Sequence, residues 1–188
     1  MNEQKTSNTT PGLQANGGRR RFLGKGAAVA PAVLTLASQP ALGVTCFTPS
    51  RSLSKNTSAS QAGKDGQCTS TKRPTDFNSS WPTSVCAANT PFHPYFSGSL
   101  KNNANGTSKT MKAVLAANQT DLAAYVITAA LNIKLGLVPV NVLTETVVKA
   151  MWTKTSVSGG YYEPTAGVKW FAAEVINYFK TNGIVGPV

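Results

Sequence analysis

The stretch "TDLAAYVITAALNIKLGLVP", Thr120 to Pro139, decides the fold class of this chain of 188 residues. Apolar residues recur along it at the spacing of one helix face, and most of the other positions are apolar too. That face consists of Leu122, Tyr125, Val126, Ala129, Ala130 and Ile133. A helix that is apolar nearly all round is a buried one. Because Asn132 and Lys134 interrupt the run, it is too short to span a membrane.

The two ends of this central helix carry recognisable signals. Thr120 is predicted to cap the helix, and Asp121 suits the positive end of its dipole. Gly136 followed by Pro139 predicts the stop.

Three more helices are predicted around the central one. They cover Met111 to Ala117, the residues after the natural N-cap Thr144, and Val168 to Thr181. The buried stripes of the last two are Val147, Val148, Met151 and Trp152, and then Phe171, Val175, Tyr178 and Phe179. Lys180 and Gly183 suit the end of the last helix. Short loops between them predict a mainly α fold, a small helical bundle over residues 101–188.

Residues 44–100 form a different kind of segment, which precedes the bundle. It is rich in Ser, Thr, Asn, Gly and Lys and has almost no apolar periodicity, so it is predicted to be loop with a short extended piece near Val44–Phe47. Its last part, "TPFHPYFSGSL", places three aromatic residues among two prolines that disfavour helix. We expect Phe92, Tyr95 and Phe96 to enter the core as an ordered crossover.

Residues 1–43 have the three parts of an export signal. A polar, basic region ends at Arg21, a mildly apolar region runs from Phe22 to Ala37, and the triplet Ala41-Leu42-Gly43 has small residues at its first and third positions. Cleavage is predicted after Gly43. The weak hydrophobicity of the middle part disfavours a permanent membrane anchor.

Within this leader, Arg19 and Arg20 are followed by one residue and then by Phe22 and Leu23. This arrangement resembles a twin-arginine translocation signal, although Gly18 replaces the usual Ser or Thr and the usual Lys comes one place late. The resemblance implies a bacterial protein that the twin-arginine translocase exports in a folded state, to the periplasm or the exterior. Such a route serves cofactor insertion, co-export with a partner, or fast folding, and the signal does not choose among these.

The three cysteines, Cys46, Cys68 and Cys86, all lie in the segment 44–100. An oxidising compartment predicts one disulfide and one odd thiol. Sequence does not assign the pair, but Cys46–Cys68 is favoured because it would close the stretch with the least apparent order. The third thiol is either buried and inert or pairs with another chain.

The net charge of +11 does not indicate a nucleic-acid surface. Five of the 18 basic residues and one of the seven acidic residues lie in the leader, which leaves 13 against 6. These 13 are scattered singly, with only Lys72 and Arg73 adjacent, whereas nucleic-acid binding needs a cluster or stripe.

His93 is the only histidine and therefore the first candidate for a general base. Between Phe92 and Pro94 it is better interpreted as a structural residue that bonds loop backbone. The spacing of His93 and the cysteines is long and irregular, so no metal site is predicted. The chain has no GxSxG, HExxH, phosphate-loop or dinucleotide motif, and no cofactor is predicted.

Several other polar and aromatic residues have both a structural and a functional interpretation. Asn132, inside the most apolar helix, is predicted to bond the backbone of a neighbouring loop, with a ligand or partner contact as the alternative. Glu163 and Glu174 could form an acid pair, but nothing places them together. Trp152 and Trp170 are predicted to anchor helices rather than to line a groove. One of the adjacent tyrosines at 161 and 162 is expected to be exposed.

The sequence as a whole predicts an exported protein without enzymatic activity that has a structural or binding role in the bacterial envelope. One alternative is an accessory subunit that is co-exported with a cofactor-bearing redox enzyme. Another is a small hydrolase or redox protein that uses His93 or a cysteine.

Overall fold

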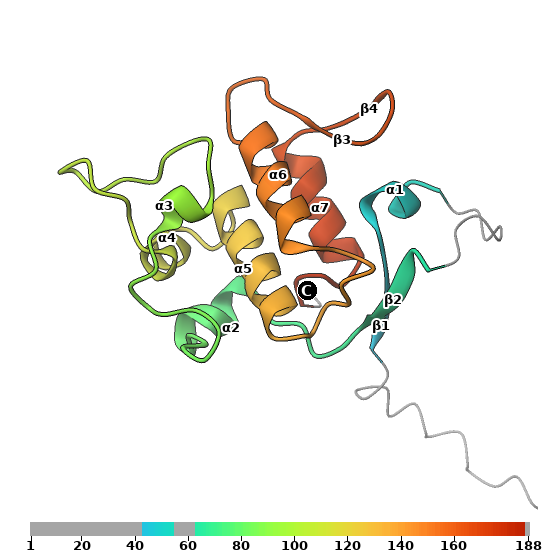
Figure 1. The fold of residues 1–188 in the computed structure, drawn as a ribbon, viewed down its shortest axis with the longest axis horizontal. Helices are drawn as coiled ribbons and strands as arrows, with labels where there is room; N and C mark the ends of the chain where they lie inside the picture. Colours follow the sequence, from blue (N-terminus) through green and yellow to red (C-terminus); the bar gives the residue numbers. More distant parts are fainter. Residues whose placement is uncertain (1–42, 55–62, 187–188) are drawn as a thin grey trace, which may run out of the picture. The chain divides into compact units, whose positions relative to one another are not determined.

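The computed structural model describes residues 43–54 and 63–186, which belong to one compact unit (Figure 1). The predicted leader residues Arg19, Arg20, Phe22, Leu23 and Ala41 lie outside the described residues. None of the helices in the described ranges has the length and apolar character that a membrane crossing requires.

Helices dominate the described residues, and two small antiparallel sheets accompany them (Figure 1). The helices are α1 (Pro49–Ser52), α2 (Pro74–Ser79), α3 (Phe92–Tyr95), α4 (Met111–Ala117), α5 (Leu122–Lys134), α6 (Glu145–Thr155) and α7 (Ala172–Thr181). The strands are β1 (Val44–Phe47), β2 (Asp65–Cys68), β3 (Tyr162–Thr165) and β4 (Val168–Trp170). The mainly α prediction is thus confirmed at the level of helical content, and the sheets add to it.

Helix α5 is the centre of the fold, as its composition predicts. Every residue from Leu122 to Asn132 is buried, and α5 packs against α2, α4, α6 and α7. The predicted cap is wrong by one residue. Asp121 caps the helix by accepting a 2.9 Å hydrogen bond from the Ala124 N–H, while the Thr120 hydroxyl donates to the Asn118 side chain instead. That local bond draws Thr120 into the preceding turn.

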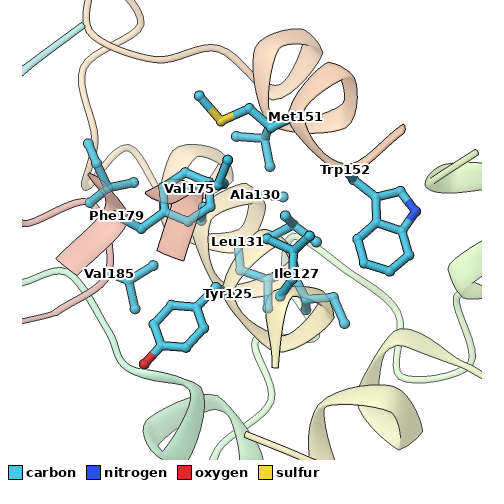
Figure 2. Close-up of a cluster of buried hydrophobic side chains, with 14 of the residues drawn as sticks. Tyr125, Ile127, Ala130, Leu131, Met151, Trp152, Val175, Phe179 and Val185 are labelled. Atoms are coloured by element: carbon cyan, nitrogen blue, oxygen red, sulfur yellow. The ribbon is translucent and has the colours of Figure 1, made fainter. Parts of the chain in front are cut away.

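The core lies where α5, α6 and α7 meet (Figure 2). Ile127 and Leu131 of α5 lie among Met151 of α6 and Val175 and Phe179 of α7. On its other side the core takes in the aromatic crossover. Phe92 and Phe96 are fully buried against Trp152, with ring centroids 5.1 and 6.5 Å from it, whereas Tyr95 is half-buried. The crossover prediction is confirmed. The prolines do not prevent a short turn, α3, although His93 inside it has an extended backbone conformation.

The last predicted helix begins later than expected. Val168–Trp170 forms a hairpin with β3, which also lies in a stretch predicted to be only turns, and α7 starts at Ala172. Gly167, at φ +80°, reverses the chain between the two strands. Phe171 was expected on the buried face but is 48% exposed, because it is the N-cap, where its backbone N–H donates to Glu174.

The polar segment before the bundle is ordered more than its composition predicts. Strands β1 and β2 pair over their full length, and a disulfide joins Cys46 to Cys68, the pair favoured from the sequence. Helix α2 replaces predicted loop. Pro74 suits its first turn, Asp76 accepts from the Arg73 N–H, and Phe77 is buried.

Hydrogen bonds made by three side chains, those of Asn132, Thr71 and Tyr178, connect this polar segment to the helices and to the residues after α7. The Asn132 amide bonds the Lys72 N–H and C=O and also the Ile184 carbonyl, at 2.9 to 3.0 Å. The Thr71 hydroxyl donates to the Gly183 carbonyl, and the Tyr178 hydroxyl donates to the Phe47 carbonyl. The structural interpretation of Asn132 is therefore confirmed.

Candidate ligand-binding cleft

A cleft of about 270 Å³ opens where five parts of the chain come together. These are the start of α2, the turn before α5, the outer sides of α5 and α7, and the residues that follow α7. The lining residues are Arg73, Pro74, Thr75, Gln119, Thr120, Tyr125, Lys180, Val185 and Gly186. Two of these side chains, Arg73 and Lys180, are cationic and none is a carboxylate.

Tyr125 forms the floor of the cleft and connects it to the core. The residue is 8% exposed, and Figure 2 shows its ring near Val185, with the hydroxyl oxygen directed away from the buried cluster. The Lys180 ammonium of α7 lies 5.2 Å from the centroid of this ring. Such a cation–π contact holds the lysine beside the cleft rather than free in solvent.

Arg73 forms the opposite wall and is positioned by the start of α2. Its Nη2 lies 3.2 Å from one oxygen of Asp76, and its Nε lies 3.4 Å from the other. Hydrogen bonds from the Arg73 side chain and backbone N–H lower the pKa of the Asp76 carboxyl below its ordinary value, which keeps the pair charged. The Arg73 side chain remains 55% exposed, so its guanidinium reaches solvent at the cleft.

The buried amide of Asn132 connects the segment that contains Arg73 to the segment that contains Val185. It bonds both Lys72, which precedes Arg73, and Ile184, which precedes Val185. The Gly186 N–H also donates to the Lys72 carbonyl. A Cβ at Gly186 would lie 2.6 Å from the Thr71 carbonyl oxygen and 3.1 Å from Arg73 Cγ, so this close approach requires glycine. The cleft is therefore preformed by the core.

A second cleft, of about 470 Å³, lies on another side of the same Lys72–Asp76 segment. Its lining residues are Lys72, Asp76, Phe77, Ser79, Ser80, Pro82 and Leu135. This lining includes one cation, Lys72, and one carboxylate, Asp76, so it has no net charge. The larger cleft consequently has less power to select a charged ligand than the smaller one.

His93, the sequence candidate for a general base, lies in the crossover before α4. Its Nδ1 is 3.4 Å from the Phe96 carbonyl oxygen, and its backbone N–H donates to the Ser108 hydroxyl. The ring thus contacts loop backbone, which is the structural role predicted for it. Cys86, outside the disulfide, is buried.

The carboxylates are divided among separate structural roles. Glu145 pairs with Lys134 and Lys149 at 3.1 and 3.0 Å. Burial opposes its charge, but Tyr95 and the two lysines outweigh this and lower the pKa of the carboxyl. Burial, with the neighbouring Glu145, raises the pKa of the Tyr95 phenol. Asp121 caps α5 and pairs with Lys101.

The remaining sequence candidates are also accounted for. Glu174 caps α7, whereas Glu163 lies exposed on β3. Trp170 is buried against Tyr178, and of the adjacent tyrosines Tyr161 is exposed and Tyr162 is half-buried. Across residues 43–54 and 63–186, no group of three His, Cys, Asp or Glu side chains could hold a metal ion.

The cleft itself was missed by sequence reasoning. From the sequence, Lys72 and Arg73 are only the one adjacent basic pair of residues 44–188, and helix packing and the helix dipole account for Tyr125 and Lys180. The available signal was a basic pair followed by Pro74 and Asp76, which predicts a helix start with an exposed arginine.

Comparison of the chain with known protein families, curated proteins and solved structures finds no match.

Proposed function

We propose that this chain is a bacterial exported protein that acts by binding rather than by catalysis, in the periplasm or outside the cell. The observation that carries the proposal is that the potentially reactive side chains are engaged in structural contacts, whereas a cleft remains open. His93, Asp121, Glu145 and Glu174 each serve a structural contact, and Cys46 and Cys68 are joined, whereas the cleft beside Tyr125 is open.

Two features support export. The leader pattern at Arg19, Arg20, Phe22 and Leu23 resembles a twin-arginine signal. Strand β1 begins at Val44, directly after the predicted cleavage site, and a buried disulfide ties it to β2. Disulfides of this kind persist in oxidising compartments outside the bacterial cytoplasm.

The export route is tested by a pair of leader variants in a bacterium that has the twin-arginine translocase. We expect Arg19→Lys combined with Arg20→Lys to leave the full-length chain in the cytoplasm. Arg21→Lys is the matched control and should be exported, since Phe22 and Leu23 set the register of the signal on Arg19 and Arg20. Equal export of both variants would contradict the twin-arginine route.

The binding role is tested by the native mass of the exported protein. We expect a mass for Val44–Val188 that is lower by two hydrogens, from one disulfide. Additional mass from a second subunit would instead support an accessory role beside a partner enzyme. Additional mass from a tightly held redox group would contradict the non-enzymatic proposal.

A further inference from the structure

We propose that the cleft between α2, α5 and α7 binds a small organic anion, with its carboxylate or phosphate group between Arg73 and Lys180 and its apolar part against Tyr125 and Val185. This inference rests on the binding role proposed above, and it adds the site and the chemical class of the ligand.

The charge of the cleft is unbalanced in a way that favours an anion. Lys180 forms no ion pair within the part of the chain that the structure describes, and its ring contact with Tyr125 leaves its three N–H donors unused. Arg73 uses Nε and Nη2 on Asp76, which leaves the Nη1 donors for a ligand. Asp76 itself is not among the lining residues.

The rest of the lining fits an organic ligand better than a bare ion. The Tyr125 ring, Pro74 and Val185 provide an apolar surface, and the hydroxyl of Thr75 can donate a hydrogen bond, whereas that of Thr120 already donates to Asn118. A volume of about 270 Å³ lies just below the usual range for pockets that hold drug-sized ligands. We therefore infer a ligand of roughly one ring rather than a polymer.

The site is also rigid where rigidity helps binding. Tyr125 is buried at its base in α5, and the Asn132 amide holds the segments of Arg73 and Val185 at a set separation. Binding then requires ordering of only two long side chains, Arg73 and Lys180, which limits the entropy cost.

The test uses three probes of one shape on the full chain, with affinity measured by isothermal titration calorimetry. The probes are benzoate, neutral benzamide and cationic benzamidine. We expect benzoate to bind at least tenfold more tightly than benzamide, and benzamidine to bind more weakly still. Phenyl phosphate should bind at least tenfold more tightly than inorganic phosphate, because its ring contacts Tyr125.

Two lysine variants then locate the site. Lys180→Gln should weaken benzoate binding about tenfold. Lys169→Gln is the matched control, because Lys169 also lies over a tyrosine ring, at 4.4 Å from the centroid of Tyr161, but outside the cleft. It should leave benzoate affinity unchanged. Both lysines are exposed, so thermal unfolding should show that both variants fold normally.

Two results would overturn the inference. Benzamidine that binds as tightly as benzoate would show that charge does not select the ligand. Equal loss of benzoate affinity in Lys180→Gln and Lys169→Gln would show only diffuse attraction to a basic surface. Neither result bears on the export of the chain. If the chain with its unmodified leader stayed in the cytoplasm, the proposed function would be contradicted, but the proposed anion site would not.

Discussion

The helical centre and the polar segment before it are stabilised in different ways. Helix α5 is one contiguous stretch whose residues from Leu122 to Asn132 are all buried. Before the aromatic crossover, the polar segment buries few large side chains, among them Phe77, and is held by a disulfide and by single hydrogen bonds to distant residues. Apolar burial is non-directional and summed over area, whereas each of these bonds depends on one geometry.

This difference indicates which region of the molecule tolerates substitutions and which does not. In the centre, the loss of one contact is shared among many neighbours. In the polar segment, one residue such as Asn132 satisfies three backbone groups at once, so few substitutions can replace it. The cleft lies at the junction of the two regions, since Arg73 belongs to the polar segment and Tyr125 to α5.

The largest effect is expected in the helical centre. Phe179→Ala removes a fully buried ring of α7 and should lower the free energy of unfolding by about 4 kcal/mol. Phe171→Ala is the control, because Phe171 is 48% exposed at the start of the same helix and should cost less than about 1 kcal/mol. Urea unfolding measures both. Similar losses would mean that both rings share one buried face, as the sequence alone suggested.

Removal of the disulfide is the next largest change. Cys46→Ala combined with Cys68→Ala should lower the free energy of unfolding by about 3 kcal/mol, because the bond closes a loop between residues 22 apart. The unmodified protein measured in a reducing agent should approach the stability of this variant. If the reducing agent has no effect, the hairpin does not depend on the disulfide.

The amide of Asn132 is a sharper test of the polar segment. Asn132→Leu has nearly the same size but removes the partner of the Lys72 N–H and of the Ile184 carbonyl, while the Lys72 carbonyl keeps the Gly186 N–H, and should cost about 2 kcal/mol. Asn177→Leu, at an exposed position of α7, should be close to neutral. A fluorescence-detected denaturant titration compares the two, and equal stabilities would contradict the role of the buried amide.

The smallest effect concerns the pH dependence of the start of α2. The folded pKa of Asp76 is lowered by Arg73, so its contribution is present above the ordinary pKa of an aspartate and is lost as the pH falls through the folded value. Asp76→Asn should cost about 0.5 kcal/mol at pH 7, a modest figure because solvent screens the pair. Thermal unfolding measured from pH 7 to pH 2 should show that the difference in stability between the unmodified protein and Asp76→Asn decreases. A difference that does not depend on pH would exclude the ion pair as its source.

Sequence reasoning succeeded where structure depends on neighbours within a turn or two. Helix α4 was predicted with its observed bounds, and Thr144 caps α6 as predicted, by accepting from the Val147 N–H. The same reasoning failed at Thr120, where two adjacent residues both had a suitable oxygen and the turn at Asn118 took one of them. It also failed at α2, because a helix of six residues in a polar segment is too short to show an apolar periodicity.

By itself, then, the sequence determined a buried central helix, the helices around it and the aromatic crossover. It favoured the Cys46–Cys68 pair that closes the first hairpin, but only the structure assigned it. The helices and the crossover depend on apolar spacing, on caps and on proline, which act over a few residues. Only the tertiary structure decided which backbone groups Asn132 bonds, that Phe171 lies outside the core, and that Arg73, Tyr125 and Lys180 line one cleft. Such placements depend on contacts between residues tens of positions apart, and their geometry exists only once the chain has packed.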